Sequence, residues 1–193
     1  MHSFMYVDTR GYVTTGIGYL LKNAQAASAL PWYHKATGRP ATSAEVKAAF
    51  DHLRDIWADH RLRNPHGRGI GASHFEDKTD LILPEGHATR LAMDRLRDEF
   101  LPRLRRLLPK FDRYPLPAQR ALVDMAYNLG VGKLGKKFPA FIKACRDGNF
   151  ALAADESRRS SSRKERNDET RDLFLEAARL NVTIQALNRE VRL

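Results

Sequence analysis

Residues 6–18 bring one carboxylate, several hydroxyl groups and three glycines into a short segment. Asp8 opens the sequence Asp-Thr-Arg-Gly, in which aspartate can hydrogen-bond its own backbone and glycine accepts positive φ, so residues 8–11 predict a turn. Residues 12–15 are aromatic or β-branched and favour the extended state, which predicts a short hairpin. Asp8 on one arm and Thr14 on the other could then share a single water molecule.

Two other interpretations of this segment stay open. Asp8 could merely cap its own turn in an ordinary hairpin. Gly16 and Gly18 would let a large molecule approach the strand closely, because no side chain stands in its way. The same pair of glycines is weak evidence for a dinucleotide-binding loop, which requires a third glycine that residues 19–22 do not supply.

The complete pattern Tyr-x-Asp-x-x-Gly-x-x-Thr-x-Gly-x-Gly over residues 6–18 resembles the active-site hairpin of the phage-type lysozymes, which hydrolyse bacterial peptidoglycan. Residues 119–130 are similar to the buried helix that floors the glycan cleft in that family. Residues 148–154, followed by Arg166-Asn167, resemble its C-terminal helices, and the Arg166-Asn167 pair is expected to order those helices. The form of residues 124–130 and the arginine-rich tail look most like the lysozyme domains of secreted antibacterial effectors.

The resemblance implies an α+β, mostly helical, two-lobed lysozyme-like fold over residues 1–193. We expect an N-terminal lobe with the hairpin and an insertion (1–83), a linking helix (84–108) and a helical lobe (109–193). The implied activity is an inverting muramidase that cuts between N-acetylmuramic acid and N-acetylglucosamine without a cofactor. By the same resemblance Asp8 and Thr14 would hold the attacking water, and the substrate would be contacted by Gly18, Leu20, Tyr127, Asn128 and Glu156.

One element of the family pattern is missing. The general acid of these lysozymes is a glutamate that precedes the hairpin aspartate, whereas the earliest glutamate here is Glu45. We expect the acid to lie upstream of Met1. The alternatives are that the acid comes from elsewhere, with Glu156 as a candidate, or that the chain is a non-catalytic wall-binding domain. Glu156 would otherwise be a solvated helix residue.

The net charge of +10 at pH 7 calls for a polyanionic partner. Nucleic acids, bacterial wall polymers and lipid headgroups are all anionic and would qualify. Nucleic acid is disfavoured because the sequence lacks a basic segment interleaved with aromatic residues. The resemblance to effectors also admits an immunity protein or a component of a secretion apparatus as a partner. With no apolar run long enough to span a membrane and no visible signal peptide, we expect synthesis in the cytoplasm and delivery to the cell wall as an endolysin or an effector.

The remaining patterns predict mostly helices. Thr42-Ser-Ala-Glu45 reads as a capping box that starts a helix through Trp57. Residues 84–108 read as one amphipathic helix of about 25 residues that Pro102 should kink. Residues 157–164 read as a polar connector before a helix over 170–187, whose apolar face holds Leu173, Phe174, Ala177, Leu180 and Ile184.

Two further chemistries are disfavoured. The three histidines near the loop at 64–71 are His60, His66 and His74, and their spacing does not fit a metal site. Cys145 is the single cysteine of the chain and lies in a helical apolar repeat, so we expect a small core residue rather than a nucleophile.

Overall fold

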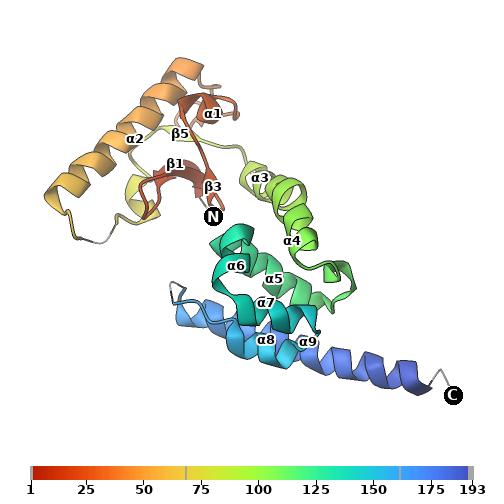
Figure 1. Ribbon diagram of the computed structural model, residues 1–193. Coiled ribbons are helices and arrows are strands. Elements are labelled where there is room, and N and C mark those ends of the chain that lie inside the picture. Colours follow the sequence, from red (N-terminus) through yellow and green to blue (C-terminus); the bar gives the residue numbers. More distant parts are fainter. Residues whose placement is uncertain (1, 68, 161, 191–193) are drawn as a thin grey trace. The chain divides into compact units, whose positions relative to one another are not determined.

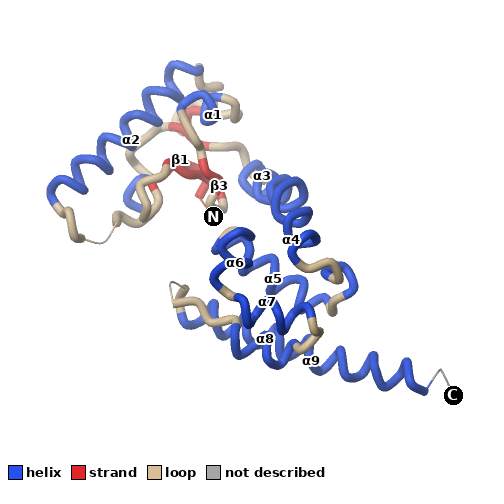
Figure 2. The backbone as a smooth tube through the Cα atoms, viewed as in Figure 1, coloured by secondary structure: helices blue, strands red, loops and turns tan. Residues whose placement is uncertain are grey.

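The computed structural model describes residues 2–67, 69–160 and 162–190, and of residues 183–190 it describes only the helical backbone. The predicted class is confirmed: the structure is α+β with 61% helix, and its strands lie in the N-terminal part of the chain (Figure 2). Internal contacts divide the chain into an N-terminal unit, Met1–Asp94, and a C-terminal unit, Arg95–Leu193. Within the described residues, no helix combines the length and apolar character needed to cross a bilayer.

The N-terminal unit is built on a three-stranded antiparallel sheet in the order β1-β2-β3. Its strands are β1 (His2–Val7), β2 (Val13–Gly16) and β3 (Tyr19–Leu20). The outer strands β1 and β3 are labelled in Figure 1. The predicted hairpin is therefore present. A second, two-stranded sheet, which the sequence patterns did not predict, pairs β4 (Tyr33–His34) with β5 (Leu81–Ile82).

Helix α2 (Ser43–Arg63) supplies the apolar layer that packs on the sheet. Its capping box is confirmed: Thr42 Oγ1 accepts from the Glu45 backbone N–H at 3.3 Å, and Glu45 Oε2 accepts from the Thr42 N–H at 2.7 Å. The other helical elements of the unit are α1 (Ala24–Ser28), a 3₁₀ turn (Ala72–Phe75) and α3 (His87–Arg95). The buried core they share includes Val7, Val13, Trp32, Phe50, Leu53 and Phe75.

The helix predicted over 84–108 is shorter and has three parts. It begins at His87 as α3, passes through a π-helical turn at Leu96–Phe100, and ends as α4 (Leu101–Leu107). The predicted irregularity therefore lies just before Pro102, which has no N–H to donate to the carbonyl one turn earlier. The boundary between the two units falls within this run, after Asp94.

The C-terminal unit surrounds the apolar helix α5 (Leu116–Leu129). Ala121, Leu122, Met125 and Ala126 of α5 are fully buried, and the helix ends at Gly130 with φ at +81°. The remaining elements are a 3₁₀ turn (Phe111–Arg113), α6 (Val131–Lys137), α7 (Pro139–Arg146), α8 (Phe150–Glu156) and α9 (Lys164–Glu190). In Figure 1, α9 is the long helix that ends the chain.

Three sequence predictions can be compared with the structure of this unit. Cys145 is a core residue as expected, and burial raises the pKa of its thiol to about 12. The connector at 157–164 is more buried than its polar sequence suggested, because Ser157 and Arg159 are both buried. Leu173, Phe174 and Ala177 lie on the packed side of α9, whereas Leu180 is exposed. Ser161 and the side chain of Ile184 lie outside the described residues.

Candidate functional site

The strand register places Asp8, Thr14 and Leu20 on one face of the N-terminal sheet. Tyr6 pairs with Thr14 and Thr14 pairs with Leu20, so these three form a row across β1, β2 and β3. Asp8 follows Tyr6 by two residues and its N–H donates to the Tyr12 carbonyl at 2.9 Å, which continues the ladder. Since side chains alternate along a strand, Asp8 and Thr14 are diagonal neighbours, a separation of roughly 7–8 Å.

The two oxygens of the Asp8 carboxylate have different surroundings. Oδ1 accepts from the backbone N–H groups of Arg10, at 2.8 Å, and Tyr12, at 3.0 Å. Asp8 therefore does cap its own turn. Oδ2 has no hydrogen-bond partner among the described residues, and Asp8 is partly exposed. One oxygen fixes the side chain and the other is left to bind a water or a ligand.

The Thr14 hydroxyl does not donate to Asp8. The Thr14 side chain is buried, and its Oγ1 donates to the Tyr12 carbonyl at 2.9 Å. A hydroxyl has one proton and two lone pairs, so Thr14 Oγ1 still has acceptor capacity for a water.

The two glycines that follow Thr14 differ in what approaches them. A Cβ on Gly16 would lie 3.1 Å from the Ala88 Cβ, so the space beside Gly16 is filled by α3. A Cβ on Gly18 would meet nothing within 4 Å. Of the two positions proposed for close approach of a ligand, only Gly18 borders open space in the described residues, and Leu20 beside it is 37% exposed.

The turn that carries Asp8 rests on the Trp57 indole of α2. A Cβ added to Gly11 would lie 2.7 Å from Trp57 Nε1, and one added to Gly69 would lie 2.9 Å from the far edge of the same ring. The indole is thus held between the hairpin turn and the loop that follows α2. Trp57 and Gly69 lie between the hairpin and residue 80, a region to which the sequence assigned no functional role. Their packing against the turn positions the Asp8 carboxylate.

This packing predicts different outcomes for two glycine substitutions. Gly11 and Gly18 both have positive φ, at +90° and +72°, so alanine is strained at either position. Only Gly11→Ala also collides with Trp57, and we expect it to cost about 2–3 kcal/mol of unfolding free energy, against about 1 kcal/mol for Gly18→Ala. Urea denaturation of both variants checks this, and equal losses would contradict the role of Trp57.

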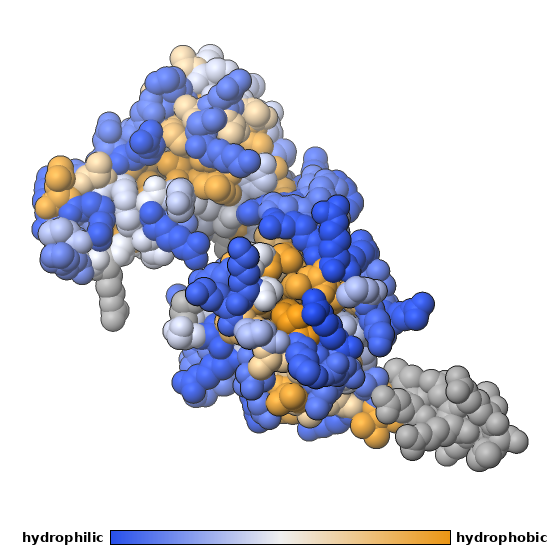
Figure 3. Space-filling view, viewed as in Figure 1, coloured by the Kyte–Doolittle hydropathy of each residue, from blue (hydrophilic) through white to orange (hydrophobic). Residues whose placement is uncertain are grey.

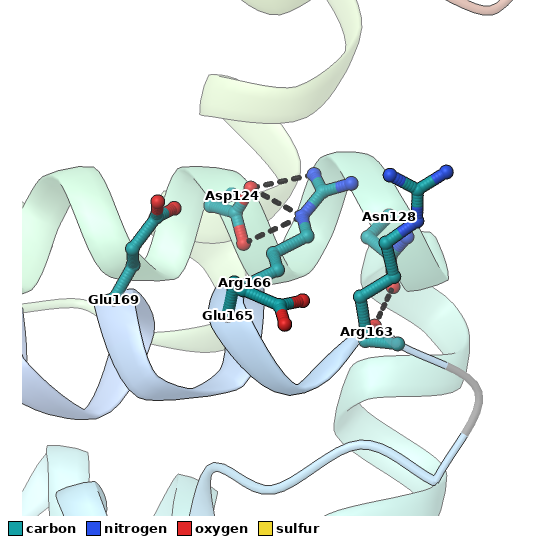
Figure 4. A pocket seen from close by; sticks show the side chains of 7 residues that line it. Asp124, Asn128, Arg163, Glu165, Arg166 and Glu169 are labelled. Atoms are coloured by element: carbon teal, nitrogen blue, oxygen red, sulfur yellow. Dashed lines mark hydrogen bonds and ion pairs between the residues drawn. The ribbon is translucent and has the colours of Figure 1, made fainter.

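In the C-terminal unit, α5 and the start of α9 line a polar hollow of about 810 Å³ (Figure 4). We call it the Asp124 hollow, and its lining residues are Asp124, Asn128, Ser162, Arg163, Glu165, Arg166 and Glu169. Asn128 Oδ1 accepts from Ser162 Oγ at 3.2 Å. Figure 4 shows Arg166 reaching across from α9 to Asp124 on α5, with Glu165 and Glu169 on the same helix as Arg166.

Asp124 is the centre of a partly buried ion-pair network, in which Arg159 is fully buried and Asp124 and Arg166 are partly exposed. Its Oδ2 accepts from Arg159 Nη1 at 2.7 Å and its Oδ1 from Arg166 Nη2 at 2.5 Å. The Arg159 side chain is fully buried and also donates to Thr170 Oγ1 and to Asn167 Oδ1. Burial by itself raises the pKa of Asp124, but the hydrogen bonds from Arg166 and Arg159 outweigh it and hold the pKa below its ordinary value. Arg166 thus joins α9 to α5, and Asn167 joins α9 to Arg159 of the preceding connector, which is consistent with the expected role of this pair in ordering the C-terminal helices.

The other predicted contacts of the C-terminal unit do not line this hollow. The Tyr127 ring is stacked on Phe100, with centroids 5.2 Å apart, and the Arg95 guanidinium lies 6.0 Å from the Tyr127 centroid. One face of Tyr127 is therefore covered by protein rather than offered to a sugar. Glu156 is exposed at the end of α8. Of the predicted residues, Asn128 alone lines the Asp124 hollow among the described residues.

The sequence patterns did not identify Asp124 or Arg159 as residues of a site. Asp124 is the one acidic residue in the sequence of α5, and such a residue in an apolar helix is a signal for a buried partner. Arg159 carried no signal, because its neighbours in sequence are polar. Within the described part of the chain, no group of three or more histidine, cysteine, aspartate or glutamate side chains could hold a metal ion.

Compared with known proteins, the chain matches no protein-family model, no curated protein and no solved structure.

Proposed function

We propose that this chain is a lysozyme-like peptidoglycan hydrolase that cleaves the glycan strand between N-acetylmuramic acid and N-acetylglucosamine with inversion of configuration. The observation that supports this most directly is the Asp8 carboxylate, which lies on the same sheet face as Thr14 and is fixed through Oδ1, while its Oδ2 has no hydrogen-bond partner among the described residues. Gly18 and Leu20 border that face and would admit the glycan.

The hydrogen bonds of the hairpin suggest how a water would be oriented. Because the Thr14 proton is donated to the Tyr12 carbonyl, both Thr14 Oγ1 and Asp8 Oδ2 would act as acceptors. A water that donates one proton to each keeps its lone pairs free to attack the anomeric carbon. In this proposal Asp8 receives a proton from the water as the new carbon–oxygen bond forms, and the glycosidic bond breaks on the opposite face.

The leaving oxygen must take up a proton from a general acid. The resemblance assigns that acid to a glutamate that precedes the hairpin aspartate, and none of the residues between Met1 and Asp8 is a glutamate. A substrate with a leaving group that needs no proton, such as a β-glycosyl fluoride of a chitooligosaccharide, therefore tests the role of Asp8 independently of the acid.

The proposal is tested by digesting purified peptidoglycan and reducing the products with borohydride before mass spectrometry. We expect new reducing ends on N-acetylmuramic acid and, with the glycosyl fluoride, a product released as the α-anomer in the proton NMR spectrum. Release of the β-anomer would overturn the inverting mechanism. Binding to peptidoglycan without any hydrolysis of either substrate would favour a non-catalytic wall-binding domain instead.

A further inference from the structure

The hairpin concentrates apolar side chains that the fold leaves uncovered. Figure 3 shows a mostly hydrophilic surface on which apolar side chains form separate patches. Among the described residues, nine large apolar side chains are exposed, and three of them, Tyr12, Ile17 and Leu20, fall within residues 12–20. Single exposed apolar side chains need no explanation, whereas a cluster of them beside polar groups is typical of a binding surface. Tyr12 is the most exposed of the three, at 55%.

Tyr12 differs from the other two tyrosines of the hairpin. Tyr6 lies against the His2 ring, with centroids 5.1 Å apart, and both Tyr6 and Tyr19 pack against the N-terminal core. In the part of the chain that the structure describes, the Tyr12 ring contacts no other ring and its hydroxyl has no hydrogen-bond partner. More than half of this side chain is therefore open to a molecule outside the chain.

The backbone of Tyr12 is bonded to both groups that would hold the attacking water. Its N–H donates to Asp8 Oδ1 at 3.0 Å, and its carbonyl accepts from the Asp8 N–H and from Thr14 Oγ1, each at 2.9 Å. Tyr12 is thus paired with Asp8 across the turn, and the two side chains leave the same sheet face with their Cβ atoms about 4.5–5.5 Å apart. Since Gly11, at φ +90°, closes the three-residue loop between them, the hairpin itself sets this spacing.

An exposed aromatic ring beside a carboxylate is suited to bind a sugar. In a β-linked pyranose of the gluco configuration every ring substituent is equatorial, so each face of the sugar presents only C–H bonds. These C–H groups pack against the negative face of an aromatic ring, and the hydroxyls at the edge of the sugar stay free to form hydrogen bonds. A sugar with an axial hydroxyl places an oxygen on one of its faces and stacks less well. N-acetylglucosamine and N-acetylmuramic acid both have the gluco configuration.

We propose that Tyr12 is a substrate-binding residue that stacks on one sugar of a β-1,4-linked glycan and selects the gluco configuration. The inference rests on the proposed function, because it takes the polymer on the sheet face of Asp8 and Thr14 to be a glycan. It assigns the aromatic platform to the hairpin instead of to Tyr127, one face of which Phe100 covers. Tyr12 binds the sugar and takes no part in proton transfer.

Calorimetric titration with chitohexaose, a soluble β-1,4 oligomer of N-acetylglucosamine, tests this contact. The chains carry Asp8→Asn, so that binding is measured without cleavage. We expect Tyr12→Ala to weaken binding about five- to tenfold, the loss of one aromatic stacking contact, and Tyr12→Phe to change it less than about twofold. The backbone bonds of Tyr12 do not involve its side chain, so the turn should persist in both variants.

Leu62→Ala is the matched control for the titration. Leu62 is an apolar side chain of α2 that lies outside the hairpin and is 82% exposed, so its truncation should leave the affinity unchanged. An equal loss of affinity in Leu62→Ala would show general apolar attraction and overturn the inference. Equal affinities in Tyr12→Ala and its parent, or a parent chain that does not bind chitohexaose, would also overturn it.

Saturation-transfer difference NMR with the same oligosaccharide shows how the sugar lies. When the aromatic protons of the protein are irradiated, we expect the axial protons of one sugar face to receive more saturation than those of the other face. This difference should persist in Tyr12→Phe and be lost in Tyr12→Ala. Equal saturation of both faces by the parent chain would contradict stacking.

Kinetics separate this inference from the proposed hydrolysis. With peptidoglycan fragments as substrate, Tyr12→Ala should lower kcat/KM severalfold, mainly through a higher KM, because stacking holds the substrate and the transition state alike. Binding that depends on Tyr12 in a chain that cleaves nothing would support the inference and refute the hydrolase. Cleavage with a KM that Tyr12→Ala does not alter would support the hydrolase and refute the inference.

Discussion

Replacing Asp8 by asparagine is expected to lower the rate of glycan cleavage at least about 100-fold, the contribution typical of a positioned general base. Asparagine keeps an oxygen to accept the backbone N–H groups of Arg10 and Tyr12, so the turn should persist. Its amide nitrogen cannot accept a proton from water in place of Oδ2. The measurement is the initial rate of new reducing ends on peptidoglycan and of fluoride release from the glycosyl fluoride.

Asp55→Asn provides the matched control for this substitution. Asp55 is an exposed residue of α2 without a partner among the described residues, so its replacement changes net charge equally but should leave both rates unaltered. If Asp8→Asn hydrolyses the glycosyl fluoride as fast as the parent chain, Asp8 is not the base. The hairpin would then contribute only to substrate binding or to the folding of the chain.

The second large effect concerns stability. Asp124→Ala is expected to reduce the free energy of unfolding by about 3–5 kcal/mol, because it leaves the buried Arg159 guanidinium without its counter-charge. Guanidinium chloride denaturation followed by circular dichroism measures the loss. Asp112→Ala removes an exposed ion pair with Arg105, which solvent screens, and should cost far less. Equal losses in the two variants would show that the Asp124 network contributes little to the fold.

The same network predicts how stability depends on pH. Because the pKa of Asp124 is lower in the folded chain than its ordinary value, its contribution is fully present above the unfolded pKa of about 4. That contribution disappears as the pH falls through the folded pKa. The difference in unfolding free energy between the parent and Asp124→Asn should therefore be constant from pH 5 to pH 7 and shrink below about pH 4. If this difference in unfolding free energy instead increased as the pH fell, it would contradict a lowered pKa for Asp124 in the folded chain.

The elements that sequence could predict are those whose signals are local. Asp8 to Gly11 defines its turn through side-chain and backbone bonds a few residues apart, and the Thr42–Glu45 capping box starts α2 where expected. The apolar repeat of α5 and the glycine at its end also act over neighbouring residues. Such features depend on covalent spacing, which the sequence contains.

The features that sequence missed depend on partners far away in the chain. Arg159 and Arg166 meet Asp124 across separations of 35 and 42 residues, and β4 pairs with β5 although each has only two residues. Strands so short have no readable alternation. The orientation of the Thr14 hydroxyl was missed for another reason: its acceptor, the Tyr12 carbonyl, is only two residues away, but sequence does not say which nearby acceptor a hydroxyl will choose.

The contact between Trp57 and Gly11 has an optical consequence. The chain contains two tryptophans, and Trp32 is 2% exposed in the core, where a polymer bound at the hairpin should leave its emission unchanged. Trp57 is partly exposed and adjoins the turn that carries Asp8. Intrinsic fluorescence at this one indole therefore supplies a label-free reporter of the hairpin, and titrating the Trp32→Phe variant with soluble glycan fragments would isolate its signal.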